Sequence, residues 1–234
     1  MMRSEASRHR EGRGQVWMDV DDGLPRVLGH CFEQFARPSG LLGRLAGHLM
    51  AKLDDDDRWL VGLLDVQPAD RVLEVGCGPG VAVALLAERA TAGLVVGLDP
   101  SEVMIRQAAR RNRAAVRAGR AELRLGMDSA LPYPDGHFTK ACTIHSLYFW
   151  PSLPDGLREL HRALAPGGQL VVAVRMRRAG AGRFDPAYFG YTERQLGDLV
   201  AALESIGFGE VTRRRWEQVG RIGRQTMEAI LARR

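Results

Sequence analysis

Three glycines at alternate positions, followed by an aspartate, form the spacing in this sequence that best suits ligand chemistry. The segment 71–80 reads RVLEVGCGPG, so a short apolar run ends in Gly76, Gly78 and Gly80. Glycines at a strand-to-helix turn let the backbone adopt positive φ and approach a ligand closely. Asp99 ends a second apolar run, 19 positions after Gly80. A carboxylate there can accept hydrogen bonds from both hydroxyls of a ribose, which predicts a site for an adenosine-containing ligand.

The position of the third glycine separates two kinds of nucleotide site. A dinucleotide fingerprint, G-x-G-x-x-G, needs a glycine at position 81, where this chain has Val81. The E-x-G-x-G-x-G pattern from Glu74 resembles instead the first motif of the class I methyltransferases that use S-adenosyl-L-methionine (SAM). The resemblance implies SAM as the cofactor and the following cofactor-binding residues: Glu74, Gly76, Cys77, Gly78, Gly80, Asp99 and Pro100.

Two of these residues also have a structural interpretation. Asp99 could cap the helix expected from Glu102, a role that Ser101 can equally fill. Cys77 could be present only because a small side chain fits inside the turn.

The resemblance extends over residues 70–175 almost without gaps. Residues 126–138 look like the family's third motif, the loop that holds the adenine, and imply contacts from Met127 and Asp128. Met127 stands where an acidic residue is common, so the acid is shifted to Asp128. The pattern is most similar to the ubiquinone-biosynthesis-type methyltransferases, which act mostly on small molecules.

The reaction implied by the resemblance is a direct SN2 transfer of a methyl group from a sulfonium to a nucleophile. Alignment of the reacting atoms is then the main task of the protein. A base is needed only where the acceptor must lose a proton, and His145, directly after the strand expected at 139–144, is the best candidate. His145 could instead contact the methionine end of the cofactor, or have a purely structural role.

Aromatic residues are the candidates for contacts with the acceptor. Tyr148, Phe149 and Trp150 follow the same strand, where aromatic faces can hold a flat or cationic substrate, or pack the next helix against the sheet. Residues 32–40 could close over the site, and Tyr188 belongs to a second possible wall. The substrate-binding candidates are Phe32, Phe35, Arg37, Tyr148, Trp150 and Tyr188.

The order of the segments predicts the architecture. Residues 1–22 are polar and are expected to form a mobile tail, and residues 23–66 carry helical periodicity and are expected to form a helical extension. Residues 67–234 are expected to form a methyltransferase domain of the α/β class. Its expected core is a Rossmann-like, seven-stranded, mostly parallel sheet with helices on both faces. Strands near 210–217 and 225–232 would form a C-terminal antiparallel hairpin.

Composition limits the alternatives. With 234 residues and 45% hydrophobic content, the chain suits one α/β domain with extensions. Its three cysteines are far apart and imply neither a disulfide framework nor a zinc site, so no metal is expected. The sequence shows no apolar stretch of transmembrane length and no signal core, which predicts no membrane contact and a cytoplasmic protein.

The net charge of +5 raises the question of nucleic-acid binding. Arg106, Arg110, Arg113 and Arg117 recur at helical spacing, but no aromatic residues alternate with them, and an ordinary solvated helix face is favoured. The expected partner is a small-molecule substrate, and the oligomeric state is not predicted. Two alternatives remain: a methyltransferase acting on protein or RNA, and a non-catalytic SAM-binding module.

Overall fold

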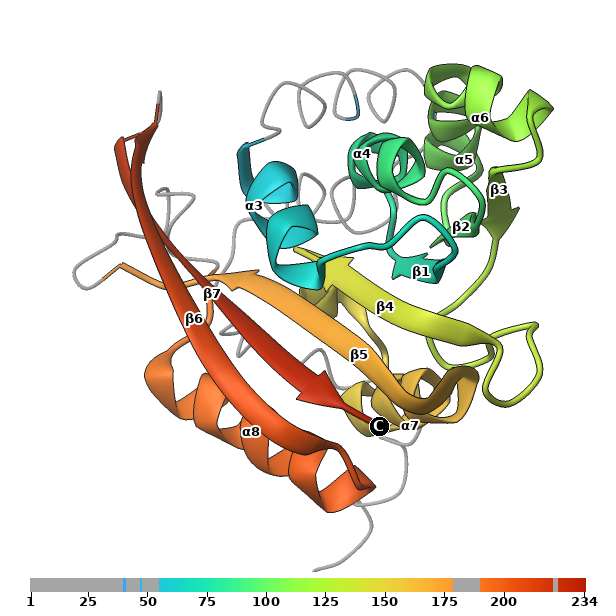
Figure 1. Ribbon diagram of the computed structural model, residues 1–234. Coiled ribbons are helices and arrows are strands. Elements are labelled where there is room, and N and C mark those ends of the chain that lie inside the picture. Colours follow the sequence, from blue (N-terminus) through green and yellow to red (C-terminus); the bar gives the residue numbers. More distant parts are fainter. Residues whose placement is uncertain (1–39, 41–46, 48–54, 179–189, 221–222) are drawn as a thin grey trace, which may run out of the picture.

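The computed structural model describes residues 40, 47, 55–178, 190–220 and 223–234. Within them, one sheet has the strand order β3-β2-β1-β4-β5-β7-β6 (Figure 1). Strands β1 to β5 pair in parallel, and β7 is antiparallel to both β5 and β6. This confirms the predicted sheet and its C-terminal hairpin. The strands are β1 (Arg71–Val75), β2 (Leu94–Asp99), β3 (Ala121–Leu125), β4 (Phe138–Ile144), β5 (Leu164–Arg175), β6 (Gly209–Gly220) and β7 (Gly223–Arg233).

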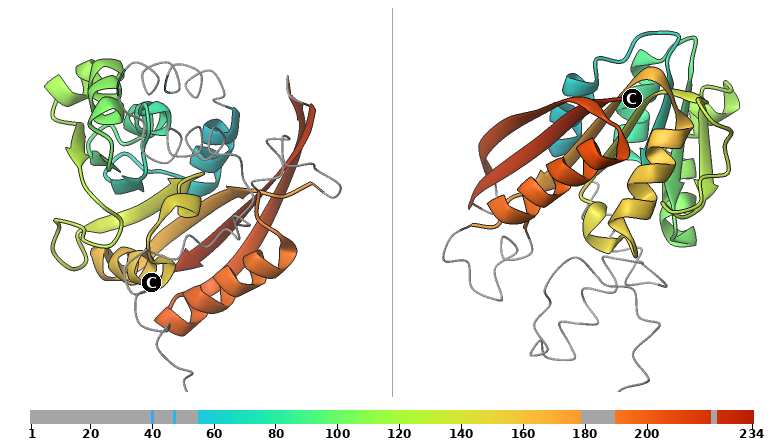
Figure 2. Two further views of the ribbon diagram at one scale, coloured as in Figure 1. Left: turned by 180° about the vertical axis from the view of Figure 1, so that it is seen from behind. Right: turned by 90° about the horizontal axis from the view of Figure 1, so that it is seen from below.

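Helices cover both faces of the sheet, so the central strands are apolar on both sides (Figures 1 and 2). One face carries α3 to α6 and the other carries α7 and α8. Leu60, Val72 and Leu86 belong to the core of the first face, and Leu157 and Leu199 to that of the second. The helices are α3 (Asp55–Leu64), α4 (Val81–Arg89), α5 (Glu102–Arg111), α6 (Arg113–Arg117), α7 (Leu153–Ala163) and α8 (Glu193–Ile206).

The helix after β2 differs from the expectation of one continuous arginine-bearing helix. It breaks at Asn112, which separates α5 from α6. The Asn112 side chain is buried and its Nδ2 donates to the carbonyl oxygens of Gly80 and Ala108, each at 2.9 Å. The amide therefore ties this helix to the glycine turn, and asparagine side chains that bond nearby carbonyls compete with helix continuation.

The two helices of the second face have caps that are visible in the sequence. In α8 the N-cap Thr192 and Gln195 form a reciprocal capping box, and Gly207 ends the helix at φ 110°. Helix α7 begins at Leu153, because Ser152 caps it by accepting from the Asp155 N–H.

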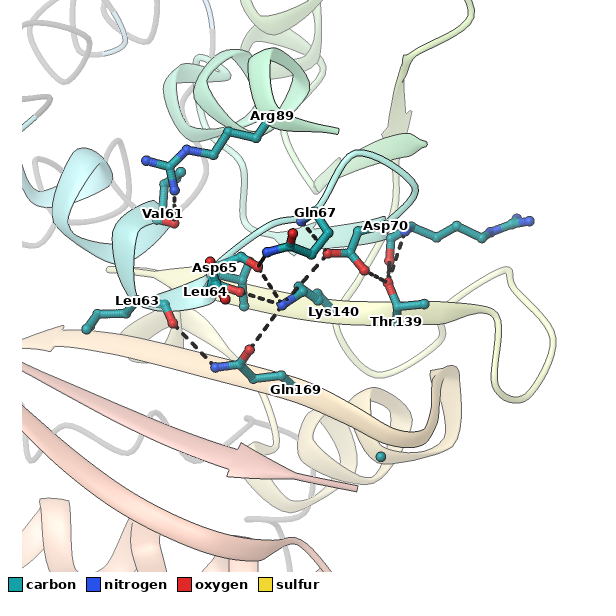
Figure 3. Close-up of polar contacts among 12 residues, drawn as sticks. Val61, Leu63, Leu64, Asp65, Gln67, Asp70, Arg89, Thr139, Lys140 and Gln169 are labelled. Carbon is teal, nitrogen blue, oxygen red and sulfur yellow. Dashed lines mark hydrogen bonds and ion pairs between the residues drawn. The ribbon is translucent and has the colours of Figure 1, made fainter. Parts of the chain in front are cut away.

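At the amino edge of the sheet, α3 is held by the side chain of Lys140 in β4 (Figure 3). The Lys140 Nζ donates to the carbonyl oxygens of Leu64 at 2.7 Å and Asp65 at 2.9 Å, and to the Gln169 Oε1 at 3.3 Å. These carbonyls lie at the C-terminal end of α3, where a cation is favoured by the helix dipole. We call Lys140, Leu64, Asp65 and Gln169 the Lys140 cluster.

Thr139, the residue before Lys140 in β4, makes further hydrogen bonds at the same edge of the sheet (Figure 3). Its Oγ1 accepts from the Arg71 N–H at 3.0 Å and donates to the Asp70 Oδ1 at 2.8 Å. The hydroxyl therefore joins the starts of β1 and β4.

Candidate functional site

A cavity lies where the carboxyl ends of β1, β2 and β4 meet, at the opposite edge of the sheet from the Lys140 cluster. Four segments line it: the glycine turn after β1, the segment after β2, the segment after β3, and the segment after β4, which contains the short 3-10 helix η1 (Leu147–Phe149). The lining residues are Val75, Gly76, Gly78, Asp99, Pro100, Met104, Gly126, Met127, Asp128, Ile144, His145, Ser146, Phe149 and Trp150. Open α/β sheets bind their ligands at this carboxyl edge.

The three glycines of the turn have different neighbours, although all have positive φ. A Cβ on Gly76 would lie 2.3 Å from the Ser146 Cβ, and one on Gly80 would lie 2.6 Å from the Asn112 Nδ2. Gly76 and Gly80 are therefore required by the packing of the protein itself. Gly78, at φ 49°, lines the cavity. The turn thus presents the backbones of Gly76 and Gly78 to the cavity, and Gly76 and Gly80 also fit tightly against neighbouring side chains.

Asp99 is the acidic residue at the end of β2, and its carboxylate is buried beside the turn. Its Oδ2 accepts from the Gly78 N–H at 2.9 Å and its Oδ1 from the Ser101 N–H at 2.8 Å. Burial raises the pKa of Asp99, and these two hydrogen bonds oppose the rise. Each oxygen keeps a further lone pair for a ligand hydroxyl. Ser101, whose hydroxyl accepts from the Met104 N–H, is the cap of α5.

Asp128 lies on the far side of the cavity from the turn, after β3. It is only 7% exposed, and its Oδ2 is buried without a hydrogen-bond partner. Burial, together with the charge of Asp155, raises the pKa of Asp128 to about 6, although its own backbone N–H opposes the rise. A buried carboxylate oxygen without a partner is costly.

Glu74 and Cys77 are buried beneath the turn and are not among the lining residues of the cavity. The Glu74 carboxylate accepts from the Val83 N–H in the first turn of α4, whose N-cap, Gly80, has no side chain to do so. Burial and the charges of Asp57 and Asp99 raise its pKa well above the usual range. Glu74 therefore contacts the start of α4, and its Oε2 has no hydrogen-bond partner.

His145 lines the cavity directly after β4 and is held from behind by α3. Its Nε2 lies 2.9 Å from the Asp56 Oδ2, and the Asp56 side chain also accepts from Arg175 at 3.5 Å and Gln218 at 2.8 Å. We call Asp56, His145, Arg175 and Gln218 the Asp56 cluster. Burial and the Arg175 charge lower the pKa of His145, against the raising effect of Asp56. The imidazole is therefore neutral near pH 7.

The aromatic residues after His145 divide between two environments. Trp150 lines the cavity, donates from Nε1 to the Ser146 Oγ at 3.2 Å, and lies against Gly156, where a Cβ would meet the indole at 2.4 Å. Tyr148 is buried, stacks on His145 with 6.5 Å between ring centroids, and accepts from the Arg175 N–H at 2.7 Å. Trp150 is thus a cavity wall, and Tyr148 supports His145.

The structure therefore brings many of the sequence-predicted residues to one cavity. Those that line it are Gly76, Gly78, Asp99, Pro100, Met127, Asp128, His145 and Trp150. Glu74, Cys77, Gly80 and Tyr148 lie behind these residues. Phe32, Phe35, Arg37 and Tyr188, as well as the expected tail 1–22, lie outside the described residues.

Sequence reasoning missed Asp56 and Ser146. Asp56 belongs to a run of four aspartates, a pattern that favours a helix N-terminus, and nothing in the sequence distinguishes the buried Asp56 from the exposed Asp55 beside it. Ser146 is a small polar residue beside His145, and its contacts with Trp150 and the Val75 carbonyl depend on the fold.

Two further observations concern ligands and membranes. The described residues contain no group of three or more His, Cys, Asp or Glu side chains arranged to hold a metal ion. Nor does any helix among them have the length and apolar character needed to cross a membrane.

A glycine turn after β1, an acid at the end of β2 and a cavity at the carboxyl edge of a 3-2-1-4-5-7-6 sheet are typical of the nucleotide-binding α/β transferases that carry SAM. Residues 72–168 match a methyltransferase domain family. The chain belongs to the class I SAM-dependent methyltransferases, and SAM is its cofactor.

Individual relatives agree with this assignment. The chain is 29% identical to the "uncharacterized methyltransferase YdaC" of Bacillus subtilis, over 71% of this chain and 87% of that protein. It is 36% identical to a "2-phytyl-1,4-naphtoquinone methyltransferase" of Synechococcus elongatus, over 45% of this chain and 46% of that protein. The fold is similar to that of a SAM-dependent methyltransferase from Aquifex aeolicus, with a TM-score of 0.63, 21% identity, and coverage of 80% and 97% of the two chains.

Proposed function

We propose that this methyltransferase transfers the methyl group to a nucleophile on a small, partly apolar molecule, by direct displacement. The observation that carries the proposal is the continuity of the cavity. One side of it consists of glycine backbone and carboxylates, and the other contains His145, Phe149 and Trp150. A cofactor and a small acceptor would therefore meet within one site.

The residues present fit SAM. Asp99 has free lone pairs beside the backbone of Gly78, which lines the cavity, and this suits the two ribose hydroxyls. Asp128 lines the cavity, and its carboxylate suits the adenine amino group, which is a hydrogen-bond donor. Gly76 and Gly78 keep the turn free of side chains next to the cofactor. Pro100 and Met127 supply apolar surface, whereas Glu74, Cys77 and Gly80 act by holding the turn.

The chemistry that the cofactor supplies is a methyl group on a sulfonium sulfur, which is intrinsically reactive. The contribution of the protein is then to orient the acceptor and exclude water, and alignment of this kind is worth up to roughly 7–11 kcal/mol. Trp150 and Phe149 provide rigid apolar walls for that purpose. His145 is placed to receive a proton where the acceptor must lose one.

The acceptor class is supported by two observations. Aromatic walls favour a flat or apolar acceptor over a polyanion. The naphtoquinone methyltransferase relative is named for a ring compound, although this chain spans less than half of that protein. The alternative is a macromolecular acceptor, which the exposed arginine stripe on α5 and α6 would bind. However, one of these arginines, Arg106, is already paired with Glu102 at 2.9 Å. A solvated helix face explains it sufficiently.

The experiment is a thermal-shift and calorimetric titration of the full chain with SAM, S-adenosylhomocysteine and NAD. At one hundred times Kd, a ligand of the native state adds about 2.7 kcal/mol, which raises Tm by roughly 5–10 °C for a chain of this size. We expect a shift with the two adenosyl-sulfur ligands and none with NAD. Release of S-adenosylhomocysteine is then compared for 1,4-dihydroxynaphthalene, transfer RNA and a peptide pool. Turnover of only the RNA or peptides, with steep salt dependence for RNA, would contradict the small-molecule proposal.

A further inference from the structure

The contact between Asp56 and His145 fixes the tautomer of the imidazole. Asp56 is 4% exposed, and its pKa is lowered because the hydrogen bond and charge of His145 and the charge of Arg175 outweigh the raising effect of burial. The carboxylate is therefore ionised near pH 7 and can only accept. Since the His145 Nε2 lies 2.9 Å from the Asp56 Oδ2, the proton of the neutral ring is on Nε2. The lone pair is then on Nδ1, in a side chain that lines the cavity.

The backbone of His145 is held in an uncommon conformation at the same place. Its φ is 53°, in the left-handed region that non-glycine residues rarely occupy, and its N–H donates to the Ala173 carbonyl at 3.1 Å. Such conformations persist where the surroundings impose them, and they are concentrated at functional sites. Here the strain turns the residue away from the path of β4 at the edge of the cavity.

Each of the elements around His145 contributes a polar or charged group to this arrangement. Helix α3 supplies Asp56, β5 supplies Arg175, β6 supplies Gln218, and the segment after β4 supplies Tyr148. The Arg175 Nε is buried without a partner, although Nη2 reaches Asp56 at 3.5 Å. The Asp56 carboxylate is thus the one anion of the cluster, and it balances both Arg175 and any positive charge that forms on His145.

We propose that Asp56 is a positioning residue, which holds His145 with the proton on Nε2 and the lone pair on Nδ1, so that His145 accepts the proton of a hydroxyl-bearing acceptor. This inference rests on the proposed function. During transfer the hydroxyl oxygen forms a bond to the methyl carbon, and the carbon–sulfur bond breaks with its electron pair left on sulfur. The hydroxyl proton moves to Nδ1, and the resulting imidazolium faces Asp56 until it loses the proton to solvent. The products are a methyl ether and S-adenosylhomocysteine.

The first test is nuclear magnetic resonance of the full chain labelled with nitrogen-15 in histidine, across pH 5 to 8. We expect the wild-type His145 to be protonated on Nε2 alone near pH 7. In Asp56→Asn its pKa should fall by about one unit, because the neighbouring anion is lost while Arg175 stays. Asp55→Asn is the matched control, since Asp55 is the exposed residue before Asp56 in the same helix turn. A proton on Nδ1 in the wild type, or the same titration in both variants, would overturn the proposal.

The second test separates this inference from the proposed function. SAM affinity is measured on the same samples, and it should be unchanged in Asp56→Asn, whose side chain lies behind the cavity. Failure of the wild type to bind SAM would count against the proposed function, whatever the tautomer. Methylation is then compared anaerobically for 1,4-dihydroxynaphthalene and 1,4-diaminonaphthalene, a matched hydroxyl and amine pair.

We expect turnover of the dihydroxy probe to fall roughly tenfold or more in Asp56→Asn, with the acidic limb of the pH–rate profile following the measured pKa of His145. Asp56→Glu should restore part of the rate. Turnover of the diamine alone, or of neither probe while SAM binds, would overturn the assignment of a hydroxyl acceptor.

Discussion

Helix α3 is attached to the sheet near both of its ends, and the two attachments use different chemistry. In the Lys140 cluster, one ammonium at the amino edge of the sheet donates to two helix carbonyls and one amide oxygen. In the Asp56 cluster, one buried carboxylate at the carboxyl edge accepts from an imidazole, a guanidinium and an amide. The first attachment connects helix and sheet only. The second also connects the helix to a residue that lines the cavity.

The two edges also differ in how completely their buried polar atoms are satisfied. The Lys140 ammonium uses its donors on protein acceptors, whereas Glu74 Oε2, Asp128 Oδ2 and Arg175 Nε, toward the carboxyl edge, are buried without a partner. Unsatisfied buried groups cost stability and are rare in folded proteins. All three lie toward the carboxyl edge, although only Asp128 lines the cavity, so this edge carries a stability cost that the Lys140 cluster does not.

The largest expected effect on stability comes from Gly76. This residue lies at the carboxyl edge, which we assign to ligand binding, and yet it is required for folding. Gly76→Ala should lower the free energy of unfolding by about 2–5 kcal/mol, since strain at φ 76° adds to a 2.3 Å approach to the Ser146 Cβ. Gly119→Ala is the control: φ is 69° there, but nothing lies within 4 Å, and about 1 kcal/mol is expected. Urea denaturation measures both, and equal losses would disprove the packing role.

Lys140→Met tests the amino edge. We expect the free energy of unfolding to fall by about 2–3 kcal/mol, because the side chain is 13% exposed and its loss leaves the Leu64 and Asp65 carbonyls without their donor. SAM affinity and the pKa of His145 should not change. Arg158→Ala, which removes an exposed ion pair, should cost no more than about 0.5 kcal/mol. A loss of SAM binding in Lys140→Met would mean that the two edges are coupled.

Asp99→Ala tests the carboxyl edge without disturbing the helix attachments. SAM affinity should fall by more than about 1.5 kcal/mol, because a pair of charge-assisted hydrogen bonds to the ribose is lost. Calorimetry measures the affinity, and Asp135→Ala, an exposed carboxylate in the loop before β4, serves as the control. Unchanged affinity would refute the assignment of Asp99 to the ribose.

The difference between the two edges also explains how far the sequence could predict this molecule. The glycine turn, Asp99 and the C-terminal hairpin were readable, since each follows from local spacing or from alternation along one segment. The Asp56 cluster could not be predicted from the sequence. Its four members, at positions 56, 145, 175 and 218, are far apart in the chain and are brought together only by the order of the strands. Glu74 illustrates a further limit: its position in the motif was clear, but not that its side chain faces the start of α4.

Asn112 shows the same limit within the fold. The arginine spacing indicated one helix, and the break depends on a hydrogen bond to Gly80, 32 residues away in sequence. Periodicity describes which face of a segment is solvated. It carries no information about a single buried amide that bonds to another segment.

The smallest expected effect is a pH dependence from Asp128. Burial raises its pKa to about 6, so in the free protein the carboxyl lowers stability as pH rises from about 4 through 6, and Asp128→Asn should remove that part of the slope. Cofactor binding has the opposite sign, because an amino donor on SAM favours the ionised form. SAM affinity should therefore rise by about 1 kcal/mol or less between pH 5 and 7, and this rise should be absent in Asp128→Asn. Calorimetry across that range measures it. Equal pH slopes for the two proteins would place the adenine away from Asp128 and leave its partnerless oxygen as a cost borne by the carboxyl edge alone.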